Sequence, residues 1–156
     1  MTITAMVILE RCRAAEKEIR LLREKIARYH DAARRMTAAL DGVGGRSSGE
    51  ADRLAAITGE IDALERRVKA REAAYSAEVA AACRLLDLLP SMETLILHRY
   101  YLKRQTLSAV AAELGYSRGY IRNLKGAACA RLGALGEGEV LRLLPQWYII
   151  EEEKRA

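Results

Sequence analysis

The side chains best suited to chemistry in this sequence lie close together in residues 117–131, where arginine, asparagine, serine, tyrosine and lysine recur at helical spacing. Arg118 and Arg122 can each present a two-pronged hydrogen-bond donor to O6 and N7 of guanine, and Asn123 can read adenine. Further lysine and arginine side chains suit phosphate oxygens, which position a protein on DNA without specifying its sequence. The chemistry indicated is recognition of nucleic acid.

Two sets of residues follow from this interpretation. The predicted base contacts are Ser117, Arg118, Tyr120, Arg122 and Asn123. The predicted phosphate contacts are Lys103, Arg104, Lys125 and Arg131. The charge distribution supports a polyanionic partner, because residues 90–132 hold seven Lys or Arg against two Asp or Glu, whereas residues 1–89 hold 16 against 14 and residues 133–156 hold three against five.

No catalytic, metal or cofactor site is predicted. Cys12, Cys83 and Cys129 are far apart, the two histidines are isolated, and no CxxC motif occurs. The glycine-rich stretch GVGGRSSG lacks the GK[ST] ending of a phosphate-binding loop, and no carboxylate pair or nucleophile–base pattern is present. We therefore expect a protein that is not an enzyme, with reduced thiols, in a reducing cytoplasm.

The contact-making segment requires a scaffold of two short helices crossing at a steep angle. Taking Leu107 as its first position, residues 106–132 fit a helix-turn-helix unit. Gly115 can adopt the left-handed conformation that ends the first helix, and Ser117 is a good N-cap for the second. The predicted core of the unit consists of Val110, Ala111, Leu114, Gly115, Tyr116, Ile121 and Leu124.

An all-α fold is expected for the whole chain, because it is rich in Ala, Leu, Glu, Lys and Arg and contains no Phe. Apolar or small residues recur at alternating spacings of three and four from Ala5 to Leu40, which predicts a coiled-coil helix. A Gly/Ser loop is predicted at residues 41–50, and the pattern resumes at Leu54. We expect a long antiparallel hairpin over residues 1–89 that forms a homodimer or higher oligomer. Its second helix carries polar residues at heptad positions 71 and 78, so the apolar line is predicted to move to Tyr75, Val79, Ala82 and Leu86.

Two further segments complete the predicted organisation. Pro90 is expected to break the hairpin's second helix, and Ser91 to cap a new one over residues 92–101. Residues 90–132 form the predicted DNA-binding domain, and residues 133–156 a tail whose apolar residues pack on the hairpin or on the tail of another subunit. No membrane span or secretory signal is predicted.

The segment from Pro90 to Leu132 resembles region 4 of sigma factors, the module that reads promoter −35 elements. The matching residues are Glu93, Leu95-Ile96-Leu97, Arg99-Tyr100, Leu107, Val110-Ala111, Leu114-Gly115, Ser117-Arg118, Ile121-Arg122 and Arg131-Leu132. Residues 8–132 together resemble small phage-encoded sigma-like transcriptional regulators. Gly119 stands where sigma factors usually have an acidic or polar residue, and Ser108 and Ala109 stand where Glu is usual, so a −35 preference is not carried over.

The resemblance implies a double-stranded DNA-binding regulator of phage or prophage genes, located in the cytoplasm of a bacterial host cell and associated with its nucleoid. Two alternatives remain open at this point. A small-terminase-type DNA-packaging subunit also combines a helix-turn-helix with coiled coils, and would assemble into rings. A module that binds bacterial RNA polymerase would act through protein contacts rather than DNA.

Overall fold

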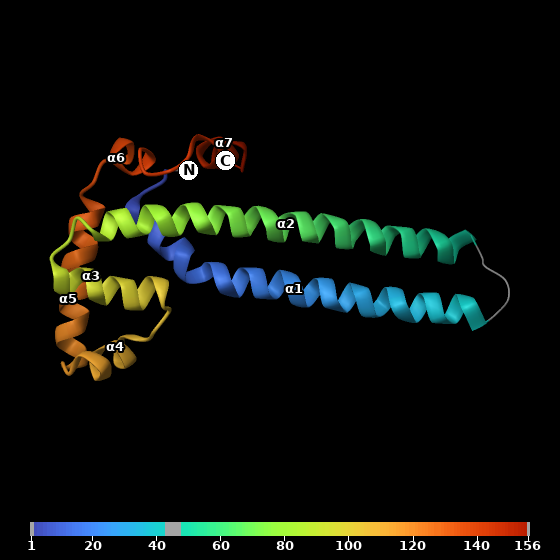
Figure 1. Cartoon of the computed structure of the whole chain (residues 1–156), viewed down its shortest axis with the longest axis horizontal. Coiled ribbons are helices and arrows are strands. Elements are labelled where there is room, and N and C mark those ends of the chain that lie inside the picture. Colours follow the sequence, from blue (N-terminus) through green and yellow to red (C-terminus); the bar gives the residue numbers. More distant parts are fainter. Residues whose placement is uncertain (1, 43–47, 156) are drawn as a thin grey trace. The chain divides into compact units, whose positions relative to one another are not determined.

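A computed structural model describes residues 2–42 and 48–155, and these residues form helices and no strand, which confirms the predicted all-α class. The elements are α1 (Ala5–Gly42), α2 (Ser48–Leu86), α3 (Ser91–Leu97), the π-helical segment η1 (His98–Leu102), α4 (Leu107–Leu114), α5 (Arg118–Gly133), α6 (Glu137–Leu141) and α7 (Gln146–Arg155) (Figure 1). None of the described helices combines the length and apolar character needed to cross a bilayer.

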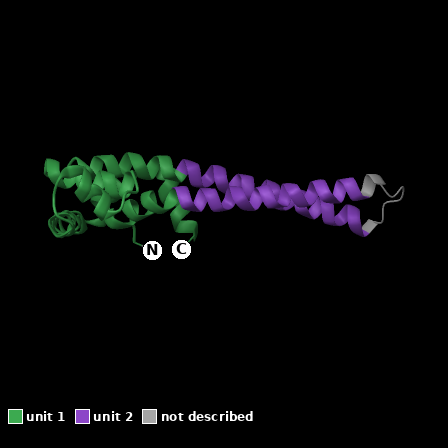
Figure 2. Cartoon of the chain, turned by 90° about the horizontal axis from the view of Figure 1, so that it is seen from below, with its two compact units in different colours: residues 1–15, 74–156 green, residues 16–73 purple. Residues whose placement is uncertain are grey.

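The long helices α1 and α2 pack against each other as a hairpin, as the heptad pattern predicts. Both helices extend into the predicted Gly/Ser loop, since α1 ends at Gly42 and α2 begins at Ser48. Residues 43–47 of that loop lie outside the described residues. The chain divides into two compact units, one of residues 16–73 and one of residues 1–15 and 74–156 (Figure 2).

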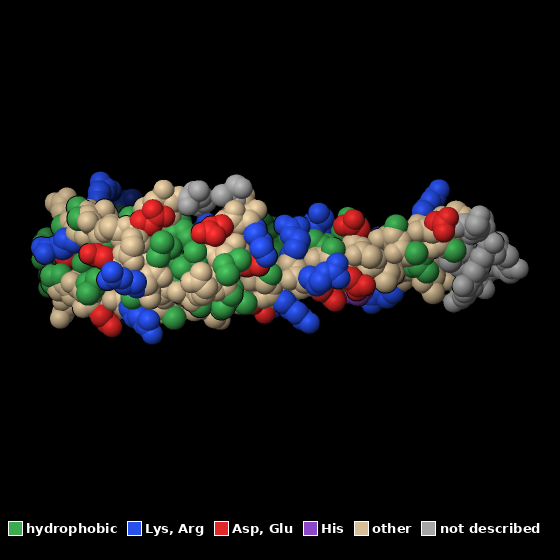
Figure 3. Space-filling view, turned by 90° about the horizontal axis from the view of Figure 1, so that it is seen from above, with side chains coloured by type: hydrophobic (Ala, Val, Ile, Leu, Met, Phe, Trp, Pro, Cys, Tyr) green, Lys and Arg blue, Asp and Glu red, His purple; other side chains and the backbone are tan. Residues whose placement is uncertain are grey.

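Within residues 16–73 the predicted seam is buried at Ile19, Ile61, Leu64 and Val68. The other described seam positions of this unit are half-buried: Leu22, Ile26, Tyr29, Ala33, Met36, Leu54 and Ile57. Ion pairs cross between the helices at Arg71–Glu18 (Nε to Oε2, 2.6 Å) and Arg23–Glu72. On the face drawn in Figure 3, basic and acidic side chains are interspersed over this unit.

The other unit, residues 1–15 and 74–156, contains the main hydrophobic core. The first turns of α1, the last turns of α2, and parts of α3, η1, α5, α6 and α7 contribute to it. The largest fully buried side chains in this core are Tyr101, Tyr148, Ile8, Leu9, Leu85, Leu86, Leu97 and Leu132. The tail therefore packs into the chain's own core through Val140, Leu144 and Tyr148, while Trp147 and Ile150 stay exposed.

The predicted move of the apolar line in α2 is only partly correct. Ala82 and Leu86 are buried, but Tyr75 and Val79 are half-buried, and Glu78 on the original line is only 1% exposed. A carboxylate can occupy this position because polar partners meet it there: the Tyr148 hydroxyl donates to Glu78 Oε2 at 2.6 Å.

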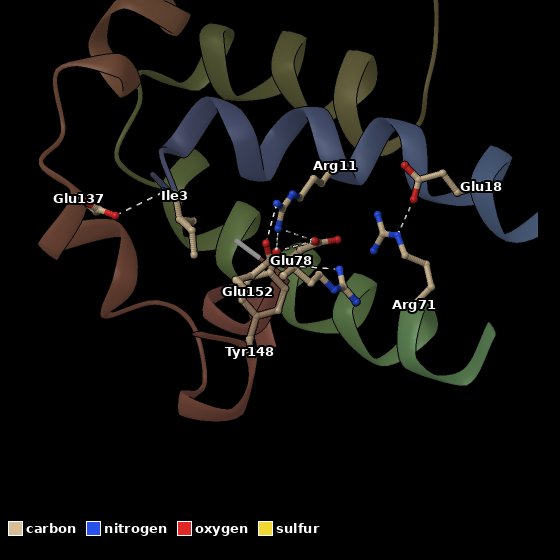
Figure 4. A network of polar contacts seen from close by, with 9 residues as sticks. Ile3, Arg11, Glu18, Arg71, Glu78, Glu137, Tyr148 and Glu152 are labelled. Atoms are coloured by element: carbon tan, nitrogen blue, oxygen red, sulfur yellow. Dashed lines mark hydrogen bonds and ion pairs between the residues drawn. The ribbon is translucent and has the colours of Figure 1, made fainter. Parts of the chain in front are cut away.

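Arg11 of α1 completes this buried network (Figure 4). Its guanidinium donates to the Tyr148 hydroxyl at 2.6 Å and to Glu152 Oε2 at 2.8 Å, and lies 4.0 Å from Glu78 Oε2. Burial opposes ionisation of Arg11, but its bonds to Glu152 and Tyr148 outweigh burial and raise its pKa above the usual value. The network therefore joins α1, α2 and α7 around one permanent positive charge.

The junction between α2 and α3 differs from the prediction. Helix α2 ends at Leu86, before Pro90, and the Thr94 hydroxyl donates to the carbonyl oxygens of Leu86 (2.7 Å) and Leu89 (3.2 Å). The prediction that Ser91 caps α3 is wrong, because Pro90 occupies the N-cap position and Ser91 is the first helical residue. Proline suits this position because its φ of −56° with ψ of 149° places its carbonyl to accept from Thr94 N at 3.0 Å.

Candidate nucleic-acid interface

The helix-turn-helix unit is built from α4, a glycine turn and α5. The Thr106 hydroxyl caps α4 by accepting from Ala109 N at 3.1 Å. Gly115 has a φ of 75°, the left-handed conformation predicted for it, and its N–H donates to Ala111 O at 2.9 Å. A side chain at this position would be strained, so glycine is what lets α4 end and the chain reverse within a few residues.

A small apolar cluster holds the two helices together. Ile96 of α3, Val110 and Ala111 of α4, and Ile121 of α5 are buried in it. Four further side chains pack partly buried against them: Met92, Leu107, Leu114 and Leu124. The cluster contains the predicted helix-turn-helix core residues except Gly115, which forms the turn, and Tyr116.

The expectation that Tyr116 belongs to the core is wrong. The tyrosine is 44% exposed and lies against Tyr120, with 4.9 Å between ring centroids and 41° between ring planes. Tyr116 lies in the turn itself, between the left-handed Gly115 and the N-cap Ser117, and its side chain is not part of the apolar cluster.

Helix α5 begins as the sequence indicates. Ser117 has extended backbone dihedrals, and its hydroxyl accepts from Tyr120 N at 3.1 Å. The predicted base contacts Ser117, Arg118, Tyr120, Arg122 and Asn123 are all exposed. Because successive residues turn by about 100° around a helix axis, Asn123 lies nearly opposite the buried Ile121, and Tyr120 and Arg122 lie on either side of Asn123.

The predicted phosphate contacts are placed in three different ways. Lys103 and Arg104 are exposed in the connection before α4, and Arg104 is the one non-glycine residue with a positive φ (57°) in the described chain. Lys125 is half-buried, with its Nζ 4.6 Å from the centroid of the Tyr100 ring. Arg131 is 61% exposed, but its Nε lies 3.4 Å from Oε2 of Glu93, which is only 7% exposed.

Both acidic residues of the segment 90–132 have internal partners. Glu93 is buried beside Arg131. Glu113 pairs with Arg99 and accepts from Gln105 Nε2 at 3.2 Å. No ion pair of Lys103, Arg118 or Arg122 is found within residues 2–42 and 48–155. The surface formed by the start of α5 and the connection before α4 is therefore strongly positive, which suits a phosphate backbone.

Arg13 braces this surface and was not predicted. Its guanidinium carbon lies 3.9 Å from the centroid of the Tyr100 ring, and Nη1 donates to the carbonyl oxygens of Tyr100 and, at 3.1 Å, Gln105. The first turns of α1 thus hold the connection that carries Lys103 and Arg104. Nothing in the sequence distinguishes this arginine from the other charged residues that flank the heptad seam.

The side chain of Tyr101 contacts α5 from the core. Its ring is buried, its hydroxyl lies 3.8 Å from Cys129 Sγ and donates to Glu10 Oε1 at 3.4 Å, and Lys125 Nζ lies 5.5 Å from its ring centroid. Burial and the neighbouring Cys129 raise the pKa of Tyr101, so the hydroxyl stays neutral. Among the described residues, no group of three His, Cys, Asp or Glu side chains is placed to hold a metal ion.

Comparison with known families agrees with this geometry. Residues 85–133 match the family described as Sigma-70, region 4, a helix-turn-helix DNA-binding region. The match contains α3, η1, α4 and α5, and so covers both helices of the unit and the residues that carry its positive surface. Neither a curated protein nor a solved structure gave a significant match to the chain.

Proposed function

We propose that this protein is a sequence-specific regulator of transcription that binds duplex DNA through residues 90–132 and acts on phage or prophage genes in a bacterial cytoplasm. The observation that carries the proposal is the exposed, cationic start of α5 directly after the Gly115 turn. In helix-turn-helix proteins this part of the second helix enters the major groove. The match to Sigma-70 region 4 supports the same role for α5.

In this proposal Arg118 and Arg122 contact guanine edges and Asn123 contacts adenine, with Ser117 and Tyr120 beside them. Lys103 and Arg104 contact phosphates and set the register of the helix on the groove. The phage assignment rests on the order of the segments, a coiled-coil hairpin followed by a region-4-like unit, which resembles phage-encoded sigma-like regulators.

We also propose that the hairpin of residues 16–73 mediates self-association. Seven of its described seam positions are half-buried in the single chain, which leaves apolar surface for a second copy to cover. A groove of about 320 Å³ on this unit is lined by Arg23, Ile26, Glu65, Val68, Lys69 and Glu72. Its apolar floor and mixed charges suit a second copy of the same hairpin, because Lys69 of one copy can face a glutamate of the other.

The test is a mobility-shift assay of the full chain on duplex DNA from upstream of the neighbouring genes. Replacing Arg118 and Arg122 by Ala should weaken binding about thirtyfold or more, because two bidentate contacts are lost and each costs about 1–3 kcal/mol. The matched control replaces Arg66 and Arg67, two exposed arginines on α2, and should bind as the wild type does. Undiminished binding by the Arg118/Arg122 variant would count against the proposal.

Solution mass separates the regulator from a packaging subunit. A dimer fits the regulator, whereas a ring of many chains would favour the small-terminase type. In a dimer, Ile26→Lys should give monomers, because it places a charge in the half-buried seam.

RNA polymerase is a second candidate partner, favoured by one observation. The tail buries Tyr148 in the core but leaves Trp147 46% exposed and Ile150 41% exposed. A pair of exposed apolar side chains on one helix is suited to a protein contact. Capture of purified polymerase by the full chain without DNA, lost on Trp147→Ala, would support this role, and no capture would remove it.

A further inference from the structure

Two exposed tyrosines lie together where α5 begins. Tyr116 and Tyr120 are 44% and 46% exposed, and their ring centroids are 4.9 Å apart. Few large apolar or aromatic side chains are exposed in the described part of the chain, and these two are the ones that lie in the helix-turn-helix unit. An exposed aromatic pair is unusual on a surface that is otherwise polar and charged.

The pair has no evident role in holding the fold together. Neither ring belongs to the apolar cluster of Ile96, Val110, Ala111 and Ile121 or to the partly buried side chains around it. Neither hydroxyl has a hydrogen-bond partner within the residues that the structure describes. Aromatic side chains exposed without an internal partner point to an external one.

The surroundings of the pair indicate which partner. Arg118 and Arg122 are exposed on the same turns of α5, and neither is ion-paired within the described chain. Gly119 stands between Arg118 and Tyr120, and a Cβ added there would meet nothing within 4 Å. The tyrosines therefore border open space at the cationic start of α5, with Arg118 and Arg122 on the other side of the helix from Tyr120, which fits a nucleic-acid groove better than an apolar protein surface.

The major groove offers one prominent apolar group, the C5-methyl group of thymine. We propose that the Tyr116–Tyr120 pair packs on a thymine methyl group in the DNA element read by α5, and so makes thymine at one position part of the specificity. This inference rests on the proposed function, since it requires that α5 enters the major groove. It adds Tyr116 to the recognition surface and gives the pair a defined chemical target.

The experiment first lets the full-length protein select duplexes from a random library, then replaces thymine by uracil at single positions of the selected site. Uracil lacks only the methyl group, so hydrogen bonding is unchanged. At one thymine the wild type should lose about fourfold in affinity, which corresponds to the burial of one methyl-sized group. For Tyr116→Ala and Tyr120→Ala the ratio of the affinity for the thymine form to the affinity for the uracil form at that position should fall to about one.

Two further variants separate the ring from other effects. Tyr116→Phe keeps the ring and should keep the uracil effect, that is, the loss of affinity when that thymine is replaced by uracil. Leu88→Ala removes an exposed apolar side chain outside the unit and should leave both affinities as in the wild type. Equal melting temperatures of all four variants show that the fold is intact.

The outcomes separate the thymine-methyl contact from the proposed DNA recognition on which it rests. If the wild type enriches no duplex, both fail. If it enriches a site that lacks thymine, or one whose uracil forms bind equally well, DNA recognition stands and the methyl contact is refuted. An unchanged uracil effect in the Tyr116→Ala and Tyr120→Ala proteins would also refute it, because the effect would then come from another side chain.

Discussion

Replacing Arg11 by Ala tests whether the buried network joins α1, α2 and α7. Arg11 is the cation between Glu78 and Glu152, and the side chains of these carboxylates are 2% and 9% exposed. Removing one partner of a buried ion pair costs about 3–5 kcal/mol, because a buried charge is left uncompensated. Arg11 is itself 21% exposed, so water can reach the vacated position, and we expect the lower end of that range, about 3 kcal/mol.

The matched control is Arg23→Ala. Arg23 also pairs with a glutamate across the hairpin, Glu72, but the two side chains are 64% and 43% exposed. Exposed pairs contribute between about 0 and 1 kcal/mol, so this variant should melt close to the wild type. Both substitutions remove an arginine side chain from α1, and the expected difference comes from the burial of the Arg11 partners and from their larger number.

Denaturant unfolding read by two probes provides the assay. Far-ultraviolet circular dichroism follows all helices, and fluorescence follows Trp147, the single tryptophan, whose ring centroid is 6.0 Å from that of Tyr148. For a chain of this size a loss of about 3 kcal/mol also lowers the melting temperature by roughly 6–12 °C. If Arg11→Ala costs no more than Arg23→Ala, or leaves the tryptophan transition unmoved, the network does not anchor α7 and the reasoning is refuted.

Three further predictions follow from the same geometry. Gly115→Ala should destabilise the protein by about 1–2 kcal/mol, because φ is 75° there, whereas Gly126→Ala, whose Cβ meets nothing within 4 Å, should stabilise α5 by up to about 1 kcal/mol; equal melting shifts would contradict this. Burial raises the pKa of Tyr101 and Tyr148, so above pH 10 the folded state keeps their protons while the unfolded state releases them. The free energy of unfolding should therefore fall as pH rises past about 10, by up to about 1.4 kcal/mol per pH unit for each tyrosine. Phe at either position should make this fall less steep when the free energy of unfolding is measured against pH. Arg122→Ala should lower the slope of log affinity against log salt by less than Lys103→Ala does, if Arg122 contacts bases and Lys103 contacts a phosphate; the reverse order in salt titrations would overturn these roles.

The hairpin and the helix-turn-helix were predictable because their signals are local. Apolar residues at spacings of three and four define a helix face without knowledge of its partner, and Gly115 followed by Ser117 marks a turn and a cap through their own backbone and side-chain preferences. Each of these features is therefore visible in a short window of sequence.

The features that were missed depend on residues far apart in the chain. Glu78 looked like a break in the seam because its hydroxyl partner, Tyr148, lies 70 residues away. Arg13 braces a connection about 90 residues downstream, and its own neighbourhood carries no sign of that contact. The motif position of Tyr116 predicts a core residue, but its ring is exposed and lies against Tyr120.

The position of Lys125 on α5 follows from the helix period, whereas its predicted role as a phosphate contact stays a prediction. It follows Ile121 by four residues and therefore lies on the buried side of α5, where Tyr100 and Tyr101 receive its Nζ. A lysine held over two aromatic rings gives up those contacts when it turns to a phosphate. The helix period alone thus argues that Lys125 supports α5 rather than extends its DNA contacts.

Arg131 is also held on the core side of α5, in this case by its partner Glu93. Glu93 is buried, and its Oε2 has no hydrogen-bond partner in the described chain, so the arginine 3.4 Å away is the nearby positive charge that compensates it. If Arg131 turned to a phosphate, the buried Glu93 carboxylate would lose that compensation, which opposes the change. If α5 binds DNA as proposed, the contacts come from its first half and from the connection before α4, while Lys125 and Arg131 hold its second half on the core.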